Sequence, residues 1–241
     1  MTREFSREQI ATLFAEARNA RVLCETILET DSTGKLIPSK ERPRLISMAL
    51  TRGKGWAAEL RSQYPIDDIR HVTEKMGVKV EISDQKGEFG NIVIRAEYYA
   101  QPPRIIIFDQ PIKAIQDIIE RVGLISLLGP DLLIAIHVLH EMFHHLENVK
   151  KDRLSECYSV TTFGLGPLRL KSGVRALTEI GAHAFAQRWL NLDWYPYVID
   201  QVERLRMEDG ATPVAQWNAL MMKRGLGKTI SQFFPRKDKI P

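Results

Sequence analysis

Cysteine is nearly absent from this sequence, since only Cys24 and Cys157 occur among 241 residues. Two distant cysteines cannot build the disulfide framework of a small secreted domain, and they lack the CxxC spacing of zinc-binding or redox motifs. Long apolar runs are absent as well. The most hydrophobic stretch, 124–139, is interrupted by Gly-Pro-Asp and is too short to span a bilayer, so we expect neither a disulfide scaffold nor a membrane protein.

The N-terminal sequence also lacks the basic start and apolar run of a secretory signal, because MTREFSREQIATLFAEARNA is charged every few residues. We therefore expect a cytoplasmic protein with reduced thiols. A content of 44% hydrophobic residues is enough to pack the core of one fairly large domain.

Acidic charge is scarce in two segments of the chain. The formal net charge is only +4, but segment 35–61 carries seven basic residues against two acidic ones, and segment 223–239 carries six against one. Such segments can contact nucleic acid or an acidic protein. Neither contains a recognisable nucleic-acid-binding motif with interleaved aromatics, so we interpret both as solvated surface and leave nucleic-acid binding as an open alternative.

The first part of the chain is expected to be a helical and basic extension. Ser6 and Gln9 form a capping-box pattern ahead of apolar residues at helical spacing, which predicts one long helix over 6–30. Prolines and glycines punctuate residues 35–61 and predict irregular chain with a short helix at 45–50.

The middle of the chain changes from a helical to an alternating pattern. A helix is expected from Pro65 to Met76, ended by Gly77. Segments 78–82, 91–99 and 104–108 are β-branched or alternating and predict a small antiparallel sheet.

Helical patterns return after these strands. Pro111 and Pro130 occupy positions typical of a first helical turn, and Ser172 is the expected N-cap of the helix in SGVRALTEIGAHAFAQRWL. Shorter helices are expected at 197–208 and 213–223. The predicted fold is therefore α+β, a small antiparallel sheet packed on helices.

Four of the six histidines fall in the stretch HVLHEMFHHLE, residues 137–147. On a helix His140 and His144 lie about 40° apart on one face, so both imidazoles can bind one cation. Glu141 lies beside them. This is the HExxH arrangement, in which two histidines hold zinc and the glutamate is the general base toward the attacking water.

The alternative is a buried core helix with hydrogen-bonded histidines, because the flanking residues are strongly apolar. Two imidazoles and a carboxylate in such a helix need compensation, since unpaired buried polar groups cost free energy. A zinc ion supplies it, and we therefore favour Zn²⁺ as the cofactor. His137 is interpreted as a core histidine or a support for a metal ligand, and His145 as an exposed or groove-lining side chain.

A catalytic zinc site needs a third protein ligand. The pattern HExxHxxGxxH is excluded, because Glu147 and Lys150 stand where the glycine and the third histidine would be. Glu179 is the predicted third ligand, since small residues beside it allow its helix to approach the histidine helix closely. Glu156 and Asp152, in the connecting loop, are the alternatives.

His183 lies one turn after Glu179 and shares its face, which makes it a rival ligand or, as we favour, a residue that orients a ligand or the substrate. Peptide hydrolysis also needs a group that stabilises the oxyanion. Tyr158, His183 and Arg175 are the candidates.

The motif HEMFHHLE, followed downstream by Glu179-Ile-Gly-Ala-His-Ala-Phe-Ala186, resembles the ImmA/IrrE family of zinc metallopeptidases, whose second motif is similar to E-x-E-A-N-x-F-A. The resemblance covers residues 65–195. It departs from the family pattern at Gly181, where a second glutamate is frequent, and at His183, where asparagine is frequent.

This resemblance implies zinc on His140, His144 and Glu179, with Glu141 as the catalytic base, in a gluzincin-like α+β core. It also implies a protein substrate, because family members cleave DNA-binding repressors. Residues 1–61 would then be an N-terminal extension and residues 62–241 the catalytic domain.

We therefore predict a zinc-dependent endopeptidase whose substrate is a protein or peptide, with a transcriptional repressor as one candidate. An extended substrate would pair with the strand nearest the histidine helix, either 91–99 or 104–108. The alternative is a non-catalytic zinc-binding regulatory protein that retains the HExxH site.

Overall fold

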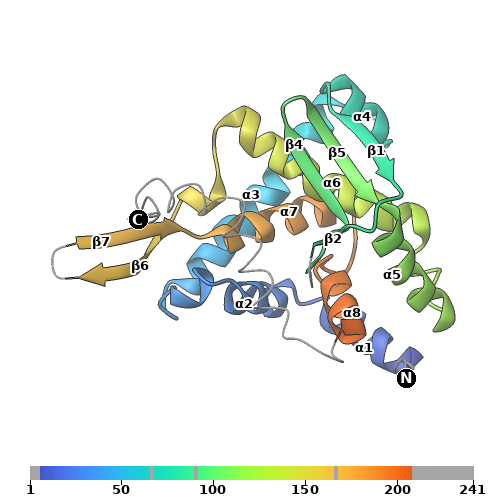
Figure 1. Cartoon of the computed structure of the whole chain (residues 1–241), viewed down its shortest axis with the longest axis horizontal. Helices are drawn as coiled ribbons and strands as arrows, with labels where there is room; N and C mark the ends of the chain where they lie inside the picture. The colour runs from blue at the N-terminus through green and yellow to red at the C-terminus, as the bar shows by residue number, and fades with distance from the viewer. Residues whose placement is uncertain (1–5, 66–67, 90–91, 166–167, 208–241) are drawn as a thin grey trace, which may run out of the picture.

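Helices dominate the computed structural model, which describes residues 6–65, 68–89, 92–165 and 168–207 (Figure 1). In chain order the elements are α1 (Arg7–Glu16), α2 (Ala20–Thr30), the 3-10 helix η1 (Gly34–Leu36), α3 (Arg42–Gln63), α4 (Ile69–Lys75), β1 (Lys79–Ser83), β2 (Glu88–Phe89), β3 (Ile92–Val93), β4 (Ala96–Ala100), β5 (Pro103–Phe108), α5 (Asp109–Arg121), α6 (Pro130–Lys150), the 3-10 helix η2 (Leu154–Glu156), β6 (Ser159–Leu165), β7 (Leu168–Gly173), α7 (Arg175–Trp189) and α8 (Val198–Met207). The predicted α+β class is confirmed.

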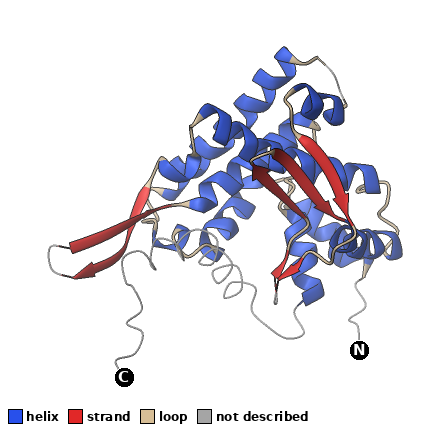
Figure 2. Cartoon of the chain, turned by 45° about the horizontal axis from the view of Figure 1, so that its top comes forward, coloured by secondary structure: helices blue, strands red, loops and turns tan. Residues whose placement is uncertain are grey.

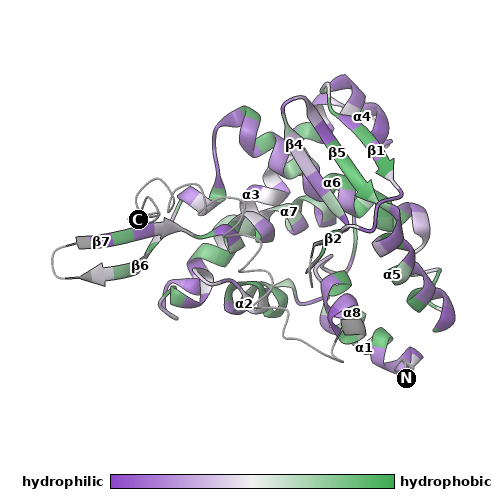
Figure 3. Ribbon diagram, in the orientation of Figure 1, coloured by the Kyte–Doolittle hydropathy of each residue, from purple (hydrophilic) through white to green (hydrophobic). Residues whose placement is uncertain are grey.

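The main sheet has three strands in the order β1-β5-β4 (Figure 2). β4 and β5 are antiparallel as predicted, but β1 runs parallel to β5, so a wholly antiparallel sheet was the wrong prediction. β5 takes the centre because Ile105, Ile107 and Phe108 are buried, which makes it the most apolar strand (Figure 3). The predicted strand 91–99 is divided into β3, which pairs with β2 in a separate two-stranded sheet, and β4, which pairs with β5 in the main sheet.

The N-terminal region forms more helix than its sequence predicts. The single helix expected over 6–30 is two helices, and Asn19 caps the second by accepting a hydrogen bond from the Arg21 N–H. The irregular chain expected over 35–61 is mostly α3, a helix of 22 residues that begins with a proline in its first turn. Residues from α1, α2 and α3 belong to the same buried apolar cluster as α6 and α7.

The close crossing of α3 and α7 explains one of the two glycines inside α3. A Cβ added at Gly53 would lie 2.1 Å from the carbonyl oxygen of Gly181 and 2.9 Å from the Ala184 Cβ. Gly53 therefore lets the two backbones touch. Gly55 has no neighbour within 4 Å of such a Cβ and points to solvent.

This difference predicts opposite effects of the same substitution two positions apart. Gly53→Ala should destabilise the protein by about 1–3 kcal/mol, because the added methyl group forces the two helices apart. Gly55→Ala, the matched control, should stabilise it by about 0.5–1 kcal/mol through the higher helix propensity of alanine. Urea denaturation of both proteins measures the two effects. Equal stabilisation by both would mean that α3 and α7 do not meet at Gly53.

Some predicted helix boundaries are confirmed and others are wrong. Gly77 follows α4 with a φ of 70°, and Pro130 lies in the first turn of α6, both as predicted. α4 itself begins at Ile69, with Asp68 as its cap, and not at Pro65. Ser172, the expected N-cap of α7, lies instead in β7, and α7 begins at Arg175 without a side-chain cap. The predicted helix at 213–223 and the basic segment 223–239 lie outside the described residues.

A β-hairpin, β6 and β7, stands between α6 and α7, where the sequence predicts a polar loop. The hairpin projects away from the rest of the fold in both views (Figures 1 and 2). Phe163 and Leu170 pair across its strands and are exposed. In the part of the chain that the structure describes, no helix is long and apolar enough to cross a membrane.

Candidate metal centre

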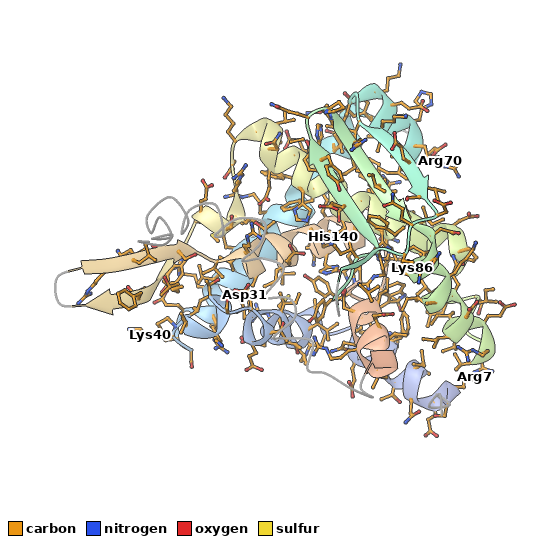
Figure 4. The ribbon with its side chains drawn as sticks, viewed as in Figure 1. Arg7, Asp31, Lys40, Arg70, Lys86 and His140 are labelled. Atoms are coloured by element: carbon orange, nitrogen blue, oxygen red, sulfur yellow. The ribbon has the colours of Figure 1, made fainter. Side chains whose placement is uncertain are left out.

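The predicted HExxH motif lies near the middle of α6. His140, Glu141 and His144 each offer one ligand atom, and these atoms lie within 4.8 Å of one another. Figure 4 shows His140 in the interior of the molecule, where α6 runs beneath the sheet. The side chains of His140 and His144 are 13% and 23% exposed, so both are largely buried.

Glu179 reaches this cluster from α7. Its Oε2 lies 3.1 Å from His140 Nε2, and its Oε1 lies 4.0 Å from His144 Nε2. The approach of the two helices depends on Gly181, because a Cβ there would lie 2.7 Å from the Phe143 ring of α6. The helices therefore bring the carboxylate of Glu179 within 4.0 Å of both imidazoles.

These three side chains fit a divalent metal by their chemistry. Burial favours the neutral acid of Glu179, but its hydrogen bond to His140 and the charges of His140 and His144 outweigh burial and lower its pKa to about 2. Glu179 is therefore ionised at neutral pH, as a metal ligand must be. Two imidazoles and one carboxylate are a ligand set that suits zinc.

His144 is supported by Glu147, a residue whose role the sequence did not reveal. Glu147 Oε2 lies 3.9 Å from His144 Nδ1, while its Oε1 accepts hydrogen bonds from the Leu154 N–H and the Thr178 hydroxyl. Burial disfavours a charged His144, but Glu147 and the other nearby carboxylates overcome this and raise its pKa to about 9. In the metal-free protein a proton therefore occupies His144, and a metal has to displace it.

Glu141 is buried beside the two histidines. Burial raises its pKa, and the positive charges of His144 and His140 oppose that shift without cancelling it. The backbone N–H of Tyr98, on the edge strand β4, also donates to this carboxylate. Glu141 is thus held between α6 and the sheet.

His145 does not line a groove and is not exposed, contrary to the sequence interpretation. It is buried, and a hydrogen bond of 2.9 Å joins its Nδ1 to the hydroxyl of Tyr98. The reason is that β4 covers this face of α6. The hydrogen bond of His145 therefore links β4 to α6 next to His144.

His137 is a hydrogen-bonded core histidine. Its Nδ1 donates to the Leu133 carbonyl at 2.7 Å, and its Nε2 accepts from the Arg95 Nε–H at 3.0 Å. Burial, together with the charge of Arg95, lowers its pKa to about 3. Arg95 also forms an ion pair with Asp200 of α8. No pattern in the sequence predicts that Arg95 and Asp200 lie beside His137.

His183 lies against His140, with ring centroids 4.6 Å apart, as its position one turn after Glu179 predicts. Its Nε2 is 3.9 Å from Asp200 Oδ2. Burial, with the positive charge of His140, lowers its pKa to about 3, so the ring is neutral.

The other candidates lie elsewhere on the surface. Asp152 pairs with Arg52, and Glu156 is exposed and pairs with Arg153, so both rival carboxylates are directed toward arginines. Tyr158 is half-buried just before β6, and Arg175 is exposed at the start of α7. Within the described residues, no hydrogen bond joins Tyr158 to His140, His144 or His183.

Comparisons with known proteins found no family model, no curated protein and no solved structure that matches this chain. The chemistry of the centre therefore has to be argued from its own side chains.

Proposed function

We propose that this protein is a zinc-dependent endopeptidase. The observation that carries the proposal is the approach of the Glu179 carboxylate to His140 and His144, with a buried Glu141 beside them. Two histidines and one carboxylate leave a coordination position for reaction, which is the composition of catalytic rather than structural zinc sites. The resemblance of HEMFHHLE and the Glu179 segment to the ImmA/IrrE motifs supports the same function.

Each residue of the site has a distinct proposed role. His140, His144 and Glu179 would hold the zinc, which, when bound, lowers the pKa of water and polarises a peptide carbonyl. Glu141 accepts the proton of the attacking water and returns it to the leaving amine. Its raised pKa makes it a stronger base than an exposed glutamate and brings it closer to the working pH.

The edge of β4 is the proposed binding place for an extended substrate. β4 hydrogen-bonds to β5 along one side and lies against α6. Its Tyr98 N–H is directed toward Glu141, so a peptide paired along this edge would pass the base. The proposed substrate is a protein or peptide of the cytoplasm, with a DNA-binding repressor as the candidate that the family resemblance provides.

A second candidate function is a zinc-binding regulator without hydrolytic activity. The limited exposure of His140 and Glu179, 13% and 23%, favours this alternative, because a substrate carbonyl needs access to the metal. Direct nucleic-acid binding has less support. In α3, Arg42 pairs with Glu25 and Glu29, and Arg52 pairs with Asp152, so part of the basic segment 35–61 is neutralised within the fold.

The test is zinc-dependent cleavage of a peptide library. We expect the purified full-length chain to contain about one zinc and to cleave unstructured peptides prepared from a bacterial proteome, as read by mass spectrometry. Cleavage should disappear with 1,10-phenanthroline and return on addition of zinc, but not of magnesium, because imidazole ligands disfavour magnesium.

Cleavage that survives the chelator would contradict the proposal, as would a carefully prepared protein that contains no transition metal. A protein with a full complement of zinc and no cleavage product would favour the regulator instead.

A further inference from the structure

Two buried nitrogen atoms beside the metal centre lack partners. His140 Nδ1 and His183 Nδ1 have no hydrogen bond in the described part of the chain, although both atoms are inaccessible to solvent. A buried polar nitrogen without a partner destabilises the fold, so two of them on neighbouring rings call for a reason. The rings lie edge to face with centroids 4.6 Å apart.

The protonation of these nitrogens is complementary once a metal is bound. His140 directs Nε2 at Glu179, so Nε2 is its metal-binding atom and Nδ1 carries the hydrogen. His183 directs Nε2 at Asp200 Oδ2, 3.9 Å away, which is longer than a direct hydrogen bond. The negative charge nonetheless favours the tautomer with hydrogen on Nε2. His183 Nδ1 is then an acceptor and His140 Nδ1 a donor, on neighbouring rings, although the two atoms are not hydrogen-bonded to each other in the described structure.

Asp200 is itself fixed from a third element. Burial favours its neutral acid, but the charge of Arg95 outweighs burial and keeps its pKa below the usual range. Arg95, whose side chain is 11% exposed, also donates to His137, one turn before His140 on α6. The contacts run from Arg95 to Asp200, then to His183 and to His140.

We propose that Asp200, held by Arg95, positions His183 as the hydrogen-bond acceptor for the metal ligand His140. Hydrogen-bond partners of this kind fix the tautomer and the ring orientation of a ligating histidine and raise its basicity. His183 and Asp200 are thus positioning residues. They contribute to metal affinity without binding the metal.

Asparagine substitutions at Asp200 and at His183 test the roles of the two residues separately. Asp200→Asn removes the negative charge near His183 Nε2 and leaves one acceptor oxygen, which can stay hydrogen-bonded to Arg95, so His183 loses the bias toward its tautomer. His183→Asn places an amide oxygen near the former Nδ1, where it can still accept from His140, and its conformation does not depend on Asp200. His183→Leu removes the acceptor.

The experiment measures the zinc dissociation constant of full-length proteins by competition with a chromogenic chelator. Asp200→Asn and His183→Leu should each weaken zinc binding about 10–100-fold, while His183→Asn should change it by no more than a few-fold. In the double variant His183→Asn/Asp200→Asn, the second substitution should cost nothing further. The visible spectrum of the cobalt-substituted protein should shift in Asp200→Asn, because the His140 ring turns.

Asp193→Asn is the matched control, since Asp193 lies in an exposed pair with Arg18. Circular dichroism of the metal-free proteins checks that each variant folds, and His183→Leu provides an independent measurement if Asp200→Asn does not fold.

Unchanged zinc affinity in Asp200→Asn would overturn the proposal, and so would an equal loss from Asp200→Asn in the presence and absence of His183. The inference rests on the metal centre of the proposed function but not on hydrolysis. If the wild-type protein binds zinc but cleaves no peptide, the peptidase proposal is refuted and this inference stands. If the wild-type protein binds no zinc, both proposals are refuted.

Discussion

Glu141→Gln should keep its zinc and lose peptide hydrolysis by a factor of about 10²–10⁴. Glutamine preserves the shape of the side chain and can still accept the hydrogen bond from the Tyr98 N–H. It cannot accept a proton from the attacking water. The measurement compares initial cleavage rates of one library-derived peptide and the zinc content of both proteins.

Glu156→Gln is the control for this substitution, because Glu156 is exposed on η2 and pairs only with Arg153 among the described residues. It should cleave at the wild-type rate. Equal rates for Glu141→Gln and wild type, both with full zinc, would rule out Glu141 as the general base. Loss of zinc in Glu141→Gln would instead make this residue a ligand, since its ligand atom lies within 4.8 Å of those of His140 and His144.

Glu179→Ala should weaken zinc binding by more than about 100-fold, which is the upper end of the effect of residues that only support a ligand. If Glu179 is the proposed third ligand, removing its carboxylate would delete a direct metal bond and leave only His140 and His144 as protein ligands. The dissociation constant is measured by chelator competition, with the zinc content after dialysis as a second measure.

Glu156→Ala and Asp152→Ala are the controls for the third ligand, because both were alternatives on the sequence alone. Their carboxylates face Arg153 and Arg52 in the structure. Both proteins should retain zinc. If Glu179→Ala retains it as well as they do, the third ligand lies elsewhere, and the proposed arrangement of α6 and α7 around the metal is wrong.

The sequence predicts those features that follow from neighbours along the chain. His140, Glu141 and His144 are spaced by one helical turn, and Pro130 marks the start of their helix, so local geometry fixes their arrangement. Glu179 was predicted as the third ligand because the small residues that follow it allow its helix to approach the histidine helix closely. His183 followed from the same helix.

The features that sequence reasoning missed depend on distant partners. Gly53 looked like a helix breaker because its neighbour, Gly181, belongs to another helix far along the chain. Arg95 and Asp200 are ordinary charged residues until the fold brings them together. The parallel pairing of β1 with β5 is equally non-local, although the apolar run RIIIF indicates a central strand.

The contact between α3 and α7 has a consequence for biosynthesis. α3 ends at residue 63 and α7 begins at residue 175. At the usual speed of translation, the apolar face of α3 waits on the order of ten seconds for its partner to be synthesised. His140, His144 and Glu179 are also synthesised after α3, so the nascent chain has no complete cluster until residue 179 has been added. The apolar face of α3 is therefore exposed, or covered by a chaperone, before the candidate metal centre can form.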